Sequence, residues 1–295
     1  MQISANGIAL EVEDHGPTSG EPLVLIMGLG MQLVAWHPDF VAMLVARGFR
    51  VIRFDNRDIG LSQRFDHLGV PNLAVDSIRY AVGMKVSAPY TVADMADDTA
   101  ALLDAMGLAA AHICGASMGG MIAQQLAVRH PPRVKSLTLI MTSSGSRKLP
   151  GPSLKVRSAL ISRPDDPKNL QSIIEHYVKF YRLIGSPAYQ PSDAYLNERL
   201  GLSVRRSYRP QGTARQMVAI AADGNRSKLL GQITAPTQII HGQQDPLVPV
   251  AAGHDLAAKI PGAQIDVIDG MGHDLPEPLW PRFVAGIGNA ASRAS

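Results

Sequence analysis

The sequence feature that most constrains the fold of this chain is the pentapeptide at residues 115–119, which reads GASMG. An apolar run, residues 109–114, precedes it, and a helix-like run, residues 121–129, follows it. A serine on a sharp turn from a strand into a helix has a strained backbone, so the positions two before and two after it must carry almost no side chain. Both positions are glycine here. The turn would expose the Ser117 hydroxyl and aim the Met118 N–H at a developing oxyanion, whereas a small-residue turn with an incidental serine is the alternative.

Alternating strand and helix patterns along the rest of the chain predict a mostly parallel central sheet flanked by helices. Asn6-Gly7 is a strong hairpin signal, and continuous apolar runs such as residues 23–27 are typical of strands buried on both faces. Thr91 is the predicted cap of a helix that runs to Met106. The expected strands are residues 2–5, 8–13, 23–27, 49–54, 109–114, 134–141, 237–241 and 264–268, and the other expected helices are residues 40–46, 121–129, 251–259 and 280–287.

The alternation stops between residues 143 and 225, where Pro and Gly separate helical segments such as residues 170–183 and no convincing strand occurs. We therefore expect a core domain made of residues 1–142 and 226–295, with residues 143–225 inserted as a helical cap. The length of 295 residues fits one domain with such an insertion.

Charge is distributed unevenly in a chain whose net charge is only +3. Residues 145–228 contain 15 Lys/Arg and 6 Asp/Glu, whereas the remainder contains 13 and 19. Two interpretations of this uneven charge stay open. The basic segment could attract anionic ligands, or it could be an insertion that packs against an acidic remainder of the protein. Nucleic-acid binding is not expected, since no recognised motif accompanies the charge.

The cysteine content and the apolar pattern of the sequence indicate where in the cell the protein is expected. Cys114 is the single cysteine, so no internal disulfide can form and nothing indicates an oxidising environment. The first 16 residues lack the apolar core of a signal peptide, and no apolar stretch reaches membrane-spanning length. The prediction is a cytoplasmic protein with no membrane partner, and the sequence leaves the oligomeric state open.

A serine nucleophile needs a base within hydrogen-bond reach and an acid that orients this base. Functional groups in a parallel sheet gather on the loops at the carboxyl ends of the strands. Asp245 follows the expected strand 237–241, and His273 follows the expected strand 264–268 on a glycine-flanked loop. The chain order Ser117, Asp245, His273 is that of a nucleophile-elbow hydrolase. These three residues are the predicted nucleophile, acid and base.

Other residues compete for these roles. Asp274 is an alternative acid, but adjacent side chains rarely orient one another well, so Asp245 is preferred. His112 and His241 lie within or at the end of expected strands, which predicts structural roles. Residues 55–60, which read DNRDIG, close a strand and are interpreted as a tight turn at the rim of the pocket rather than as catalytic.

The second oxyanion donor is expected in the loop at residues 28–30, which reads GLG. Its glycines let the backbone approach a substrate, and the Leu29 N–H is the candidate that would act beside the Met118 N–H. A dinucleotide-binding fingerprint is rejected because Leu33 occupies the place of its third glycine. No His, Cys or carboxylate cluster has metal-ligand spacing and no phosphate-binding loop occurs, so neither a metal nor a cofactor is expected.

With these motifs in place, the chain resembles the α/β-hydrolase superfamily over nearly its whole length outside the cap. The resemblance rests on residues 115–120 (GASMGG), 55–62 (DNRDIGLS), 245–249 (DPLVP) and 270–273 (GMGH). Within the superfamily the chain is similar to serine carboxylesterases, namely small bacterial carboxylesterases and aclacinomycin methylesterase. It departs from many relatives at residues 27–28, where Met-Gly replaces His-Gly, so the oxyanion loop must be anchored differently.

The resemblance implies an α/β-hydrolase fold with an inserted cap and the hydrolysis of a small-molecule carboxylic ester through an acyl-enzyme on Ser117. The same triad also supports lactone opening, acyl transfer, hydrolysis of carbon–carbon bonds in diketones and cofactor-free perhydrolysis. A ligand receptor of low turnover on this fold is a further alternative. Serine at position 117 disfavours the branch of the superfamily that uses an aspartate nucleophile.

Overall fold

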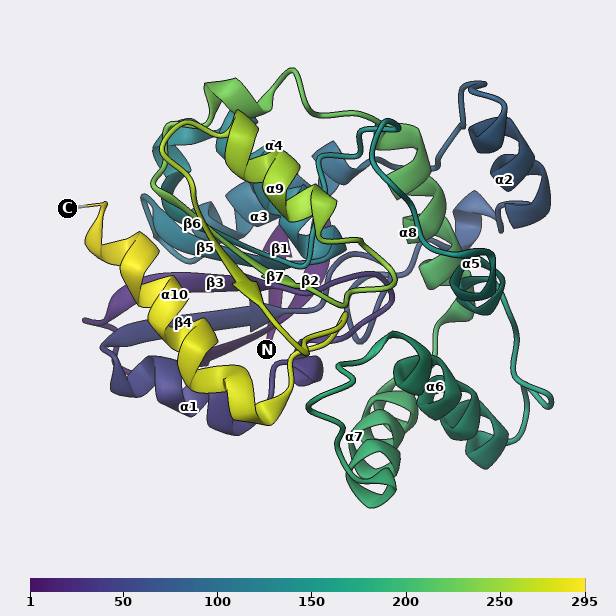
Figure 1. Ribbon diagram of the computed structural model, residues 1–295. Coiled ribbons are helices and arrows are strands. Elements are labelled where there is room, and N and C mark those ends of the chain that lie inside the picture. Colours follow the sequence, from purple (N-terminus) through teal and green to yellow (C-terminus); the bar gives the residue numbers. More distant parts are fainter. Residues whose placement is uncertain (295) are drawn as a thin grey trace.

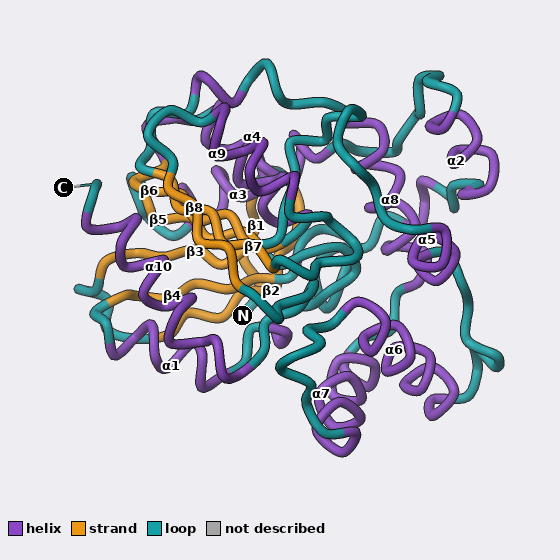
Figure 2. Tube along the Cα trace, viewed as in Figure 1, coloured by secondary structure: helices purple, strands orange, loops and turns teal. Residues whose placement is uncertain are grey.

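The computed structural model describes residues 1–294. Its centre is an eight-stranded sheet (Figures 1 and 2) whose strands are β1 (Gln2–Ala5), β2 (Ile8–His15), β3 (Glu21–Ile26), β4 (Phe49–Phe54), β5 (Ala111–Ala116), β6 (Val134–Ile140), β7 (Thr237–Gly242) and β8 (Gln264–Ile268). The spatial order is β1-β2-β4-β3-β5-β6-β7-β8. β2 pairs antiparallel with β1 and β4, and all other pairs are parallel. The mostly parallel sheet expected from the sequence is confirmed.

Two layers of helices cover the sheet (Figure 1). α1 (Pro38–Ala46) and α10 (Trp280–Ser292) contribute to the apolar core on one face. α3 (Val92–Ala105), α4 (Met118–Arg129) and α9 (Ala251–Lys259) contribute to the core on the other face. The carboxyl ends of the parallel strands, where functional loops gather, therefore stay free of these layers.

Strand β3 shows why the sheet is buried on both faces. Val24 and Ile26 belong to the core that includes α3 and α4, whereas Leu23 and Leu25 belong to the core that includes α1 and α10. Successive side chains of a strand point to opposite faces. A continuous apolar run is therefore what a strand with helices on both sides requires.

The chain between β6 and β7 is helical, with α5 (Leu154–Leu160), α6 (Leu170–Ile184), α7 (Asp193–Arg206) and α8 (Pro210–Asp223). Within the described residues, 143–225 contain no strand, as the sequence predicts. These helices and α2 (Leu73–Ala81) lie to the right of the sheet in Figure 1. Ile173 and Ile174 of α6 pack with Val204 of α7 in a small core separate from the cores on the two faces of the sheet.

Most expected boundaries lie within two residues of the observed ones, and the differences have local causes. The predicted cap at Thr91 is confirmed, because the Thr91 side chain accepts from the Asp94 N–H and the Asp94 carboxylate accepts from the Thr91 N–H. α4 begins three residues earlier than expected, since β5 continues to Ala116 and only Ser117 separates strand from helix. α2 has no counterpart among the expected elements, because two helical turns give too short a periodic pattern.

Candidate active site

Ser117 lies at a turn that connects β5 directly to α4. Its backbone has φ 54° and ψ −119°, a conformation that costs a residue with a side chain on the order of 1–3 kcal/mol. No larger residue fits at the flanking glycines. A Cβ on Gly115 would lie 2.2 Å from the Gly119 carbonyl oxygen, and a Cβ on Gly119 would lie 2.0 Å from the Ile26 carbonyl oxygen. The strained strand-to-helix turn expected around Ser117 is therefore present.

The structure brings Ser117, Asp245 and His273 together from three separate loops. Ser117 Oγ lies 3.0 Å from His273 Nε2, and His273 Nδ1 lies 2.7 Å from Asp245 Oδ2. The other carboxylate oxygen of Asp245 accepts hydrogen bonds from the N–H groups of Leu247 and Val248, at 2.9 and 2.8 Å. Asp245 and His273 are both buried, so the contact between them is shielded from water, whereas Ser117 is partly exposed.

This arrangement fixes the direction of the hydrogen bonds. A carboxylate only accepts, so His273 Nδ1 carries the proton that faces Asp245. In the neutral imidazole Nε2 is then an acceptor, and the Ser117 hydroxyl donates to it. A base in this tautomer can take the proton of a serine hydroxyl as its oxygen attacks a carbonyl carbon.

Asp274, the competing acid, makes its contacts elsewhere. Its carboxylate accepts hydrogen bonds from the Ser186 hydroxyl, from the Ser186 N–H at 3.1 Å and from the Tyr181 hydroxyl at 2.9 Å. Burial raises the pKa of Asp274, against the lowering effect of these hydrogen bonds. Asp274 therefore links the loop that carries His273 to the segment that follows α6.

The loop after β3 passes directly beside Ser117. A Cβ on Gly28 would lie 3.1 Å from Ser117 Cβ, so a residue without a side chain lets the backbone approach this closely. Neither the Leu29 N–H nor the Met118 N–H donates a hydrogen bond to a group within residues 1–294. Both predicted oxyanion donors thus remain available to a ligand at Ser117.

Two side chains that the sequence motifs do not reveal anchor this loop. Asn56 Nδ2 donates to the Met27 carbonyl oxygen at 2.9 Å, and Gln216 Oε1 accepts from the Gly30 N–H at 2.9 Å. These two contacts hold the loop at the Met27 carbonyl oxygen and at the Gly30 N–H. Asn56 could have been suspected because it directly follows a buried strand, whereas Gln216 on α8 has no sequence signal.

Asp55 braces the adjacent segment, which the sequence predicts to be a tight turn. Its carboxylate accepts from the N–H groups of Leu33 and Leu61 at 2.7 and 2.8 Å, and Arg206 of α7 lies 2.7 Å away. Burial raises the pKa of Asp55 even though these three donors favour its ionised form. The contacts agree with a structural role at the rim of the site.

Asp58 makes a second connection to the helices between β6 and β7. Arg215 of α8 donates two hydrogen bonds to its carboxylate, at 2.5 and 2.8 Å, and the Tyr90 hydroxyl donates a third at 2.9 Å. Burial alone would raise the pKa of Asp58, but the donors, Arg215 first, lower it below its usual range. The pairs Arg206–Asp55 and Arg215–Asp58 show that part of the uneven charge is an internal match.

Replacing Arg215 with methionine is expected to lower the free energy of unfolding by about 3–5 kcal/mol, because Asp58 would stay buried without its charged partner. The matched control is Arg282→Met, which breaks the exposed pair between Arg282 and Asp266 and is expected to cost about 0–1 kcal/mol. Urea unfolding of the three proteins measures both effects. If both variants lose the same small amount of unfolding free energy, the buried pair between Arg215 and Asp58 does not stabilise the packing of α8.

The two histidines assigned structural roles make local contacts. His112 Nδ1 lies 2.8 Å from Ser136 Oγ, between β5 and β6. His241 Nε2 lies 2.7 Å from the Val248 carbonyl oxygen, and burial lowers the pKa of His241. The contact of His241 stabilises the turn in which Asp245 lies.

Residues 1–294 contain neither a metal-binding cluster nor a membrane-spanning helix. No group of three or more His, Cys, Asp or Glu side chains there could bind a metal ion. No helix in the same part of the chain is long and apolar enough to cross a membrane.

A cavity of about 30 Å³ lies between the oxyanion loop and the helices α6 to α8. Its walls come from three parts of the chain and include Gly30, Met31, Gln32, Ile59, Gly60, Tyr177, Val204, Tyr208, Arg209 and Thr213. A volume of this size accommodates about one water molecule. The helices therefore pack closely over the loop at residues 28–30 in this conformation.

Comparisons with known proteins complete the description of the site. A family model described as alpha/beta hydrolase fold matches residues 21–277. The chain is 28% identical over 299 residues to rhodomycin D methylesterase DauP of Streptomyces sp. (strain C5). This alignment covers 94% of each protein. Among solved structures it is similar to the meta-cleavage product hydrolase CumD of Pseudomonas fluorescens IP01, with a TM-score of 0.75, 23% identity and coverage of 100% of this chain and 98% of CumD. A thermophilic esterase from Thermogutta terrifontis gives a TM-score of 0.72, 22% identity and coverage of 100% and 98%.

Proposed function

This chain belongs to the alpha/beta hydrolase fold family, and on that premise we propose that it is a serine hydrolase that cleaves carboxylic esters through an acyl-enzyme. The observation that carries the proposal is the hydrogen-bonded series Ser117–His273–Asp245 at the carboxyl ends of β5, β7 and β8. Similarity to a methylesterase along 94% of the chain supports an esterase-like hydrolase activity.

The proposed reaction has two stages. Ser117 Oγ attacks the ester carbonyl carbon while His273 Nε2 accepts the hydroxyl proton, and Asp245 stabilises the imidazolium that forms. The carbonyl oxygen becomes an oxyanion, which accepts from the Leu29 and Met118 N–H groups. His273 returns the proton to the departing alcohol. Water, activated by the same imidazole, then releases the acid from Ser117.

We also propose that residues 143–225 act as a cap over this site. Gln216 of α8 contacts the oxyanion loop, and Arg206 and Arg215 contact the turn beside it. The cavity between these helices and residue 30 of the loop holds about one water, which indicates close packing of the helices against this end of the loop. A cap in this position would select substrates by size.

The test is an activity screen with p-nitrophenyl esters of increasing acyl length. We expect many turnovers on the acetate and butyrate esters and a lower kcat/KM for long acyl chains, because the proposed cap would limit the space for the acyl group. Release of one equivalent without turnover would indicate a ligand receptor instead. Faster turnover of lactones or diketones, or peroxide-dependent halogenation with weak hydrolysis, would assign the same triad to another reaction.

A further inference from the structure

Helix α2 exposes its apolar face to solvent. The exposed large hydrophobic side chains between residues 61 and 84 are Leu61, Leu68, Val70, Val75, Ile78, Tyr80, Val82 and Met84. Val75, Ile78 and Val82 follow one another at intervals of three and four, which places them on one face of a helix. Ile78 is 64% exposed and Val82 is 65% exposed. An ordinary surface helix buries this face against the protein instead.

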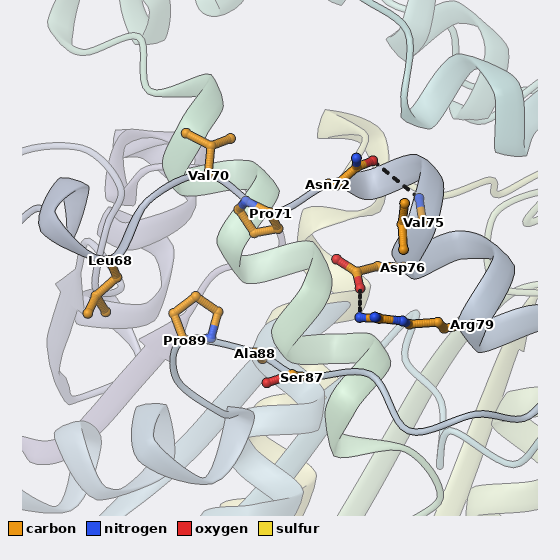
Figure 3. A pocket seen from close by; sticks show the side chains of 10 residues that line it. All are labelled: Leu68, Val70, Pro71, Asn72, Val75, Asp76, Arg79, Ser87, Ala88 and Pro89. Carbon is orange, nitrogen blue, oxygen red and sulfur yellow. Dashed lines mark hydrogen bonds and ion pairs between the residues drawn. The ribbon is translucent and has the colours of Figure 1, made fainter.

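The helix is capped at its first turn and attached to the rest of the protein at its end, and an open groove lies along one side of it. The Asn72 side chain caps its first turn, and Arg147 donates to the carbonyl oxygens of Tyr80 and Ala81 at its end, at 2.7 and 3.1 Å. An open groove of about 530 Å³ separates α2 from residues 87–89. Figure 3 shows Val75, Asp76 and Arg79 on the α2 side of this groove, and Ser87, Ala88 and Pro89 opposite them.

Basic side chains are frequent in the segment that contacts the end of α2. Residues 70–88 and 145–163 together contain seven Lys/Arg and one Asp, namely Arg79, Lys85, Arg147, Lys148, Lys155, Arg157, Arg163 and Asp76. All seven basic residues are exposed. The contact of Arg147 with the end of α2 brings the two segments together, and α5 adds Leu154, which is 82% exposed. We name residues 70–88 and 145–163 the α2–α5 face.

We propose that the α2–α5 face binds the surface of an anionic lipid bilayer. An interfacial helix buries apolar side chains at the level of the lipid headgroups, while neighbouring Lys and Arg attract anionic lipid. A second copy of the chain fits this face less well, because two surfaces with the same excess of positive charge repel one another. This mode of contact needs no spanning helix, so it departs from the sequence expectation of no membrane partner.

The proposal does not depend on the reaction at Ser117, so its test measures binding rather than catalysis. The full chain is sedimented with vesicles of phosphatidylcholine alone and with vesicles that also contain an equal share of phosphatidylglycerol. We expect at least about tenfold tighter binding to the mixed vesicles, lost on addition of salt. Ile78→Asp/Val82→Asp and Lys148→Glu/Lys155→Glu should each weaken it about tenfold or more.

The controls introduce the same kinds of change, an apolar residue to Asp and a basic residue to Glu, on α7, outside the α2–α5 face. Leu202 and Arg205 are exposed there, and Leu202→Asp and Arg205→Glu should bind the mixed vesicles as the unchanged protein does. An unchanged Tm shows that each variant is folded. Equal binding to both vesicle types, or undiminished binding by the α2 variant, would overturn the proposal. A dimer in light scattering that Ile78→Asp/Val82→Asp dissociates would assign the face to a second copy instead.

Discussion

Replacing Ser117 with alanine is expected to lower kcat on a good ester about a millionfold, and replacing His273 with alanine should cost nearly as much. The first change removes the nucleophile, and the second removes the group 3.0 Å away that takes its proton. The kcat of the double variant should be little lower than that of either single variant, because the two residues act as a unit. Steady-state kcat of the purified, folded proteins on one p-nitrophenyl ester measures all three effects.

The structure offers a matched control for this pair of substitutions. Ser136 and His112 are also a buried serine and histidine in hydrogen-bond contact, at 2.8 Å, but they lie away from the carboxyl ends of the strands. Ser136→Ala and His112→Ala should keep kcat and labelling by a fluorophosphonate, apart from losses of stability. Labelling should vanish in Ser117→Ala. Labelling that persists there would show that another residue is the nucleophile.

Much of the fold could be predicted because its signals are local. A strand buried on both faces needs a continuous apolar run, as in β3. A helix start needs a capping side chain, which Thr91 supplies, and the strained turn at Ser117 needs glycine on both sides. The rule that functional loops follow the carboxyl ends of parallel strands then selected Asp245 and His273. The structure brings these side chains together with Ser117.

The contacts that support the site could not be predicted in the same way. Gln216 reaches the oxyanion loop from α8, and Arg206 and Arg215 pair with the carboxylates of Asp55 and Asp58. Each contact joins residues more than a hundred positions apart. The pattern of apolar and polar residues in one sequence does not indicate which distant side chains will pair. The exposed stripe on α2 could not be predicted either, first because the helix is too short to give a clear periodic pattern. In addition, helical spacing of apolar residues does not tell whether the face that they form is buried or exposed.

Asp245→Asn is expected to lower kcat about ten thousandfold while the fold is kept. The Leu247 and Val248 N–H groups contact one carboxylate oxygen of Asp245, at 2.9 and 2.8 Å, and His273 contacts the other. In the variant these two donors select the amide oxygen, so the amide NH2 faces His273 Nδ1. The imidazole must then accept at Nδ1 and carry its proton on Nε2, which is the wrong tautomer for a base towards Ser117.

Asp274→Asn is the matched comparison, because it makes the same change at the adjacent acidic residue. The Asp274 carboxylate contacts Ser186 and Tyr181 rather than the imidazole, so we expect kcat to fall by less than about tenfold and stability to fall by about 1–3 kcal/mol. The kcat of both variants on one ester, with urea unfolding of each, separates the two roles. Near-normal turnover in Asp245→Asn together with a large loss in Asp274→Asn would make Asp274 the acid, and His273 would then have to turn towards α6 during the reaction.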